Sequence, residues 1–297
     1  MRSLFPLALA AVLHAASAQS LPDLLSRVSE EAAVFRNAAP QIVSEETLTQ
    51  RALKPVRVRP HLGAAAAKPA PPSFETREIV SEYSFGAFTD APESLHEFRE
   101  IVSVDGRRVS SSQSARHSLA LGLTSRNDRA RKRMLEKFQK HGLVTAVTDF
   151  GPLLLLFTRR QMANYSFELG PRARIGADLA QIITYRQTAG PARMLVFQGR
   201  QALHQPIEGR IYVRLPDGLP LRITITSSRT EGSHTYRDEA SVDYVLSPQG
   251  FLAPASVMHH GYADDKEMVE DSFRYTPFRK FGADAEIKFD ALPGPAK

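Results

Sequence analysis

The chain has 297 residues, of which 42% are hydrophobic and 24% are charged, and its formal net charge is +6. This composition is typical of globular proteins, so it excludes a largely disordered chain and a fibrous repeat. Cysteine is absent, which excludes disulfides, thiol catalysis, cysteine-bound zinc and a lipid-modified N-terminal cysteine. No apolar run reaches the length of about eighteen residues that a membrane-spanning helix needs.

The first 18 residues have the features of a secretory signal peptide in the right order. Arg2 supplies a positive charge, an apolar stretch follows, and Ala16-Ser17-Ala18 fits a cleavage site between small residues. The alternative is a buried N-terminal helix. We predict a signal peptide at 1–18 and a periplasmic or secreted protein, a location that argues against a nucleic-acid partner despite the basic charge.

Three kinds of segment follow the signal peptide. Within residues 19–60, apolar residues at helical spacing predict an amphipathic helix from Pro22 to Arg36, and residues 41–53 are strand-like. Residues 61–73 are rich in Ala and Pro, so they predict a surface loop. Residues 74–290 then predict an antiparallel β-sheet wrapped around a helical insert at 125–160.

Alternation of apolar and polar residues is the main evidence for the sheet. Segments 75–88 and 94–104 are strand-like, and Asp105-Gly106 is a hairpin signal between 94–104 and a return strand. Strands dominate again from Asn164, with turns at 215–218 and 247–250. The prediction is mainly β with an α insert: one curved antiparallel sheet of roughly eight to eleven strands, close to sequence order.

The insert contributes two predicted helices, 127–141 and 150–160, which we expect on the concave face together with the N-terminal helix. The second carries the apolar run Leu153, Leu154, Leu155, Leu156 and Phe157, which requires burial on nearly all sides. The first is strongly basic, and its cations include Arg126, Arg129, Arg131, Lys132 and Arg133. They form either a solvated helix face or a contact for an anionic lipid surface.

Catalytic signatures are missing from the sequence, so no catalytic residue, metal ligand or cofactor is predicted. The segment from His96 to Glu100 begins like a zinc-protease motif but lacks the second histidine. His259-His260 and Asp264-Asp265 are the nearest approach to a metal or acid–base cluster. Because adjacent strand residues point to opposite faces, we interpret this segment as a strand that leads into a hairpin turn, with a site as the alternative.

Aromatic residues provide candidates for a ligand cavity. Phe85, Phe88, Phe273 and Tyr275 line an apolar cavity together with Leu153–Phe157 if the half-barrel is incompletely filled, and otherwise belong to the core.

The C-terminal 120 residues or so resemble bacterial periplasmic proteins built like LolA and LolB. The resemblance rests on Gly209–Val213 with Leu221–Thr224, on Ser241–Tyr244, on Phe251–Val257 and on Phe273–Phe281, in this order. It implies a half-barrel that is concave and apolar inside and covered by helices. Relatives use it to hold lipid or lipoprotein acyl chains, or to sense them and regulate a membrane partner.

Three functional hypotheses follow. The first is an exported, non-enzymatic carrier that holds an acyl chain or another hydrophobic ligand. The second is a periplasmic sensor or interaction protein with a filled core, which docks on a membrane partner. The third is an enzyme, for which only His259, His260, Asp264 and Asp265 offer support.

Overall fold

The computed structural model describes residues 19–54, 73–87, 95–125, 128–144, 149–190, 194–198 and 201–281. The predicted signal peptide and the Ala/Pro-rich loop up to residue 72 lie outside these ranges. The predicted domain boundaries are not tested by the structure.

Helix α1 (Leu21–Ala38) is the predicted N-terminal helix. Ser20 and Asp23 form a reciprocal capping box at its start, where Pro22 is tolerated because the first N–H groups have no partner within the helix. Its apolar side chains at helical spacing face the sheet and are almost completely buried: Leu24, Val28, Ala32 and Phe35.

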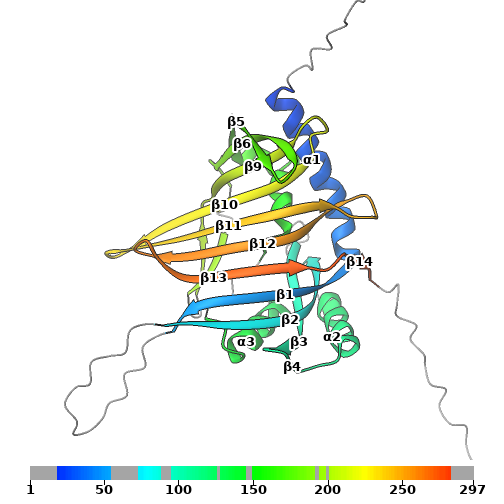
Figure 1. The fold of residues 1–297 in the computed structure, drawn as a ribbon, viewed down its shortest axis with the longest axis vertical. Coiled ribbons are helices and arrows are strands. Elements are labelled where there is room, and N and C mark those ends of the chain that lie inside the picture. Colours follow the sequence, from blue (N-terminus) through cyan, green and yellow to red (C-terminus); the bar gives the residue numbers. More distant parts are fainter. Residues whose placement is uncertain are drawn as a thin grey trace, which may run out of the picture.

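The described strands form one curved antiparallel sheet of 12 strands and a separate hairpin (Figure 1). The order in the sheet is β4-β3-β2-β1-β13-β12-β11-β10-β9-β6-β5, and β14 pairs with β1. The strands are β1 (Ile42–Leu53), β2 (Phe74–Ala87), β3 (Leu95–Val104), β4 (Arg107–Arg108), β5 (Tyr165–Ile175), β6 (Asp178–Gln187), β7 (Met194–Gln198), β8 (Gln201–Gln205), β9 (Glu208–Arg214), β10 (Pro220–Glu231), β11 (His234–Leu246), β12 (Leu252–Ala263), β13 (Lys266–Tyr275) and β14 (Arg279–Lys280).

The predicted fold class is confirmed, but two details of the sheet differ from the prediction. The first strand, β1, lies between β2 and β13, so the two ends of the described chain meet in the middle of the sheet. Strands β7 and β8 pair only with each other, and β9 therefore pairs with β6. The described sheet also has more strands than the predicted eight to eleven, because two short strands are added to it: β4 at the edge beside β3, and β14 beside β1.

Hairpin turns lie where the sequence predicts them. Asp105 and Gly106 both have positive φ, as a two-residue turn that matches the strand twist requires. Asp264 and Asp265 adopt the same left-handed conformation between β12 and β13. The interpretation of this segment as a hairpin turn is confirmed.

The helical insert agrees with the prediction in part. Helix α3 (Asp128–Lys140) matches the predicted basic helix and buries Met134, Leu135 and Phe138. The predicted helix at 150–160 is instead a short 3-10 segment, η2 (Gly151–Phe157), in which Pro152 has non-helical backbone angles. Two further 3-10 turns are η1 (Ala39–Gln41) and η3 (Met162–Asn164).

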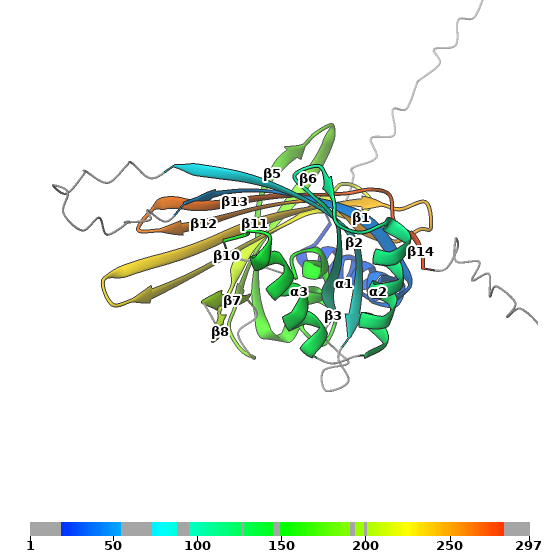
Figure 2. The same ribbon diagram turned by 90° about the horizontal axis from the view of Figure 1, so that it is seen from below.

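Helix α2 (Ser112–Ser125) was not predicted. Its Leu119 packs with Val43 and Phe98, whose neighbours along the strands point into the main core, so α2 covers the opposite face of β1–β3. The predicted helices α1 and α3 and the segment η2 all contribute to the main core on the concave side, and Figure 2 shows α1 and α3 beneath the sheet. Among the described helices, none has the length and apolar character of a membrane span.

Candidate functional site

The apolar segment η2 occupies the concave face of the sheet. Leu153, Leu154 and Phe157 are buried, whereas Leu155 and Leu156 are half-buried at its margin. The backbone of η2 is tied to the sheet by Tyr244, whose hydroxyl accepts from the Leu154 N–H (3.0 Å) and lies 3.0 Å from the Gly151 carbonyl oxygen. The segment is therefore held against the concave face of the sheet, and we refer to η2 (Gly151–Phe157) as the plug.

The predicted aromatic residues gather beside this plug, except Phe88, which lies outside the described residues. Phe85 is buried, with its ring centroid 5.3 Å from Phe35 and 5.0 Å from Tyr83. Phe273 is buried as well, and the half-buried Tyr275 lies 4.8 Å from the ring of Tyr83. These side chains pack against one another rather than around a large open space.

Charged side chains are buried beneath the plug, and the sequence analysis did not identify them. The Arg99 guanidinium donates to Glu46 (2.6 and 2.8 Å) and to Glu97 (2.9 Å), and all three residues are buried. Burial raises the pKa of Glu46, and the charge of Arg99 opposes this shift. Burial acts to lower the pKa of Arg99, but the two carboxylates more than offset it and keep the guanidinium charged.

Glu97 joins this charged cluster to the segment that leads into the plug. Its carboxylate accepts from the backbone N–H groups of Asp149 (2.6 Å) and Gly151 (2.8 Å) and from the Tyr83 hydroxyl (2.7 Å). The Asp149 carboxylate in turn accepts from the Glu97 N–H (2.9 Å) and pairs with His96. The plug is thus docked by reciprocal hydrogen bonds as well as by apolar contact.

A second buried charge cluster surrounds His259, which is completely buried. Its ring lies 3.0 Å from Asp271 and 3.2 Å from Asp238, and the Phe150 ring stands against it at 5.1 Å. Burial acts to lower the pKa of His259, but hydrogen bonds and the charges of the two aspartates raise it to about 9. His260 points to the opposite face, as the sequence predicts.

A small cavity of about 140 Å³ opens beside the plug. Its apolar wall includes Leu153, Leu155, Leu156 and Ile225, and polar side chains of Arg36, His96, Asp149 and Gln161 stand at its rim. Small-molecule sites usually measure about 300–1,000 Å³. The cavity therefore admits only part of a ligand of ordinary size while η2 stays in place.

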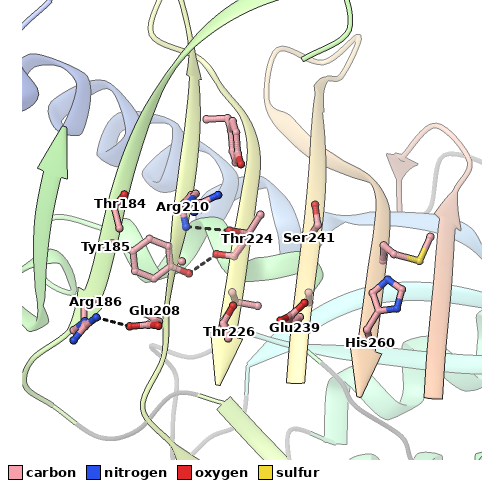
Figure 3. Close-up of a pocket in the computed structure, with 15 residues that line it drawn as sticks. Thr184, Tyr185, Arg186, Glu208, Arg210, Thr224, Thr226, Glu239, Ser241 and His260 are labelled. Carbon is pink, nitrogen blue, oxygen red and sulfur yellow. Dashed lines mark hydrogen bonds and ion pairs between the residues drawn. The ribbon is translucent and has the colours of Figure 1, made fainter. Parts of the chain in front are cut away.

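A larger, shallow groove of about 470 Å³ lies on the outer face of β6, β9, β10, β11 and β12 (Figure 3). Its floor is rich in hydroxyl and charged groups, including Thr184, Thr224 and Thr226. At Gly209 the strands approach so closely that a Cβ atom would overlap the Thr224 carbonyl oxygen. Tyr185, from the buried side, donates to that carbonyl oxygen at 2.8 Å.

Of the predicted cations on α3, only the side chain of Arg133 lies in the described part, where it is exposed. Arg126 falls outside the described residues, and so do the side chains of Arg129, Arg131 and Lys132. Lys137, on the same helix, pairs with Glu100 at 2.7 Å. The proposed contact with an anionic surface therefore stays a prediction.

No family model and no curated protein matches this chain. Among solved structures, the chain is similar to an outer membrane lipoprotein-sorting protein domain from Vibrio parahaemolyticus, with 10% identity and a TM-score of 0.35 over 86% of this chain and 91% of that one. It is also similar to a DUF1329 family protein from Desulfovibrio piger, with 8% identity and a TM-score of 0.37 over 86% and 92%. Both similarities are at low identity and concern the fold alone.

Proposed function

We propose that the chain is an exported, non-enzymatic binding protein that holds a lipid acyl chain or another apolar ligand on the concave face of its sheet, beneath η2. The observation that carries the proposal is the amphipathic cavity at the margin of the plug, where Leu155 and Leu156 are only half-buried. Its apolar wall and polar rim match a molecule with an apolar chain and a polar end. The similarity in fold to a lipoprotein-sorting domain is consistent with this proposal.

Displacement of η2 is part of the proposal, because the cavity alone is too small for an acyl chain. Burying a Leu or Phe side chain contributes about 1.5–3 kcal/mol to the free energy of folding. Moving the plug exposes such side chains to water and therefore costs free energy. A ligand that buries a similar apolar area on the same wall offsets that cost. The described structure, with η2 in place, then corresponds to the closed form.

A second candidate function is a sensor or interaction protein whose core stays filled. The complete burial of Leu154 and Phe157 favours it, because these side chains already occupy the place that a ligand would take. In this case the basic helix α3 is the surface that meets an anionic membrane or a protein partner.

Two pairs of substitutions distinguish the candidates. For a carrier, Leu154→Ala should cost about 2–5 kcal/mol of stability, whereas Leu155→Ala should cost less and weaken ligand binding. Likewise, Leu155→Asp should fold but lose ligand, while Leu154→Asp should unfold because its carboxylate would be buried without a partner. Thermal melts with and without palmitate, and native mass spectrometry of the complexes, provide the measurements. Large losses for both alanine variants that palmitate does not change would favour the filled-core protein.

A further inference from the structure

Strands β12 and β13 bring three metal-ligand side chains together on the outer face of the sheet. His260 comes from β12, and Glu267 and Glu270 come from β13. One donor atom from each lies within 4.8 Å of the other two, and all three residues are half-buried. His260 also lines the outer groove, as Figure 3 shows.

A β-bulge is the reason that both glutamates share one face. Gly261 pairs with Val269 but Tyr262 pairs with Glu267, so Met268 is the extra residue of β13. In a regular strand, Glu267 would point to the same side as the buried Val269, into the core. The bulge turns Glu267 to the outer face beside Glu270, and bulges commonly re-aim side chains in this way next to functional sites.

The three side chains are already paired in part. The His260 Nδ1 atom lies 2.7 Å from Glu267 Oε1. On the neighbouring strand, Arg51 Nη1 lies 3.3 Å from Glu267 Oε2 and 3.9 Å from Glu270 Oε2, with its guanidinium over the Phe74 ring at 3.8 Å. Two carboxylates therefore share one partly exposed cation.

The two glutamates outnumber the one arginine beside them, and the neighbouring charged residues do not change this. Glu239 is the cross-strand neighbour of His260 on β11, and it forms its own ion pair with Arg237. Arg237 also stands over the Tyr262 ring at 4.4 Å. Arg237 is thus already paired with a carboxylate of its own.

We propose that His260, Glu267 and Glu270 bind a divalent transition-metal ion of the zinc type. One imidazole nitrogen and two carboxylate oxygens are suitable donors for such an ion, and ligand atoms on a tetrahedral zinc stand about 3.3 Å apart. In the structure, one donor atom from each of the three residues lies within 4.8 Å of the other two, so the ligand set is gathered in one place.

Metal binding at this site requires His260 to coordinate through an unprotonated nitrogen and both glutamates to be ionised. The hydrogen bond between His260 and Glu267 opens as the ion enters between them. Arg51 competes with the ion for the same two carboxylates. Substitutions at these residues should therefore change the zinc affinity in a specific pattern, which a nonspecific surface site would not show.

The test is isothermal titration of the full chain with zinc chloride. The proposal predicts one saturable site whose affinity falls at least about tenfold in His260→Gln and in Glu270→Gln, since loss of a direct ligand should cost at least as much as loss of an outer-shell partner. Arg51→Gln should bind zinc more tightly. His234→Gln is the control, because His234 lies at the start of β11 and pairs with Asp264 rather than with any of the three proposed ligands, and its affinity should equal that of the wild type.

Metal-free melts of the same variants establish that each is folded, and Glu267→Gln replaces any variant that is not. Absence of saturable zinc binding by the wild type would overturn the proposal. Binding that survives His260→Gln and Glu270→Gln unchanged, or that falls equally in His234→Gln, would overturn it as well. Because the site is on the outer face, none of these outcomes depends on the apolar ligand proposed for the concave face.

Discussion

Arg99 lies at the centre of a cluster in which three charged side chains are removed from water. Its guanidinium bridges Glu46 and Glu97, and its carbon centre stands 5.0 Å from the Tyr83 ring. A buried ion pair is weak evidence of net stabilisation, because desolvation offsets the attraction. Removing one partner alone is costly, since a charge is then left buried without compensation.

Arg99→Met should therefore destabilise the protein by about 3–5 kcal/mol at neutral pH. The loss should become smaller in acid, because Glu46, whose pKa is already raised by burial, then takes up a proton. Urea unfolding at neutral and mildly acidic pH measures both effects. Arg186→Met is the control: Arg186 pairs with Glu208 in solvent, so we expect a loss of about 0–1 kcal/mol. Equal losses for the two variants would contradict this account.

His259 gives stability a dependence on alkaline pH. Its pKa rises from the model-peptide value of 6.5 to about 9 on folding, so its contribution is complete below about 6.5 and is lost as the pH rises through 9. His259→Gln should be less stable than the wild type by a few kcal/mol at pH 6, and the difference should shrink towards pH 10. Urea unfolding across this range is the measurement.

The exposed His117 provides the control for that experiment. His117→Gln should change the stability little at pH 6, because the side chain lies at the surface. A difference between His259→Gln and the wild type that stays constant from pH 6 to pH 10 would show that the buried imidazole is not charged.

The burial of these charged residues could not be predicted from the sequence, for a physical reason. Strand alternation predicts which residues share a face of the sheet. A Glu or Arg on a strand is ordinarily assigned to the solvent-exposed face. Glu46, Glu97 and Arg99 lie on the buried face. Glu46 is on β1 and the other two are on β3, so their ion pairs form across the intervening strand β2. Only the pairing of those strands brings them together.

The plug η2 is the element on which the proposed function depends. Gly151 lies at its start, so close to the sheet that a Cβ atom would overlap the Tyr83 hydroxyl and stand 2.8 Å from Glu97 Oε1. A side chain at this position therefore weakens the docking of the plug without changing its apolar residues.

Gly151→Ala should lower thermal stability and raise the affinity for palmitate, because the closed form that competes with ligand becomes less favourable. Melting temperatures and palmitate titrations measure the two effects. Gly122→Ala, in α2, is the control, since a Cβ atom there meets nothing within 4 Å. A stability loss with unchanged or weaker palmitate affinity would contradict the view that η2 must move.

The helices show which elements the periodicity of apolar residues can predict and which it cannot. Helices α1 and α3 have strong apolar stripes, and they form close to their predicted bounds. Helix α2 was missed because its sequence is rich in serine and only weakly amphipathic, although Ser111 accepts from the Ser114 N–H at its start. The apolar run in η2 predicted burial correctly for Leu153, Leu154 and Phe157, but Leu155 and Leu156 are half-buried, and the segment is a 3-10 turn broken at Pro152 instead of an α-helix.

At the scale of the whole molecule, local sequence predicted the class of the sheet better than its order. Hairpins follow from turn residues and alternation, so the neighbours from β9 to β13 agree with sequence order. The pairing of β1 with β13 joins segments more than two hundred residues apart, and no local signal specifies it. This pairing joins the N-terminal strands β1–β4 to the C-terminal strands in one sheet.

The central claim is that an apolar ligand binds this concave face beneath η2. The most direct measurement is photo-crosslinking of the wild-type protein with a diazirine fatty acid, followed by mapping of the labelled peptides. We predict saturable labelling of Gly151–Phe157 and of the start of β3 around Leu95, which line the cavity, and loss of this labelling when palmitate competes. Labelling confined to the outer face, or labelling that palmitate does not reduce, would contradict the account.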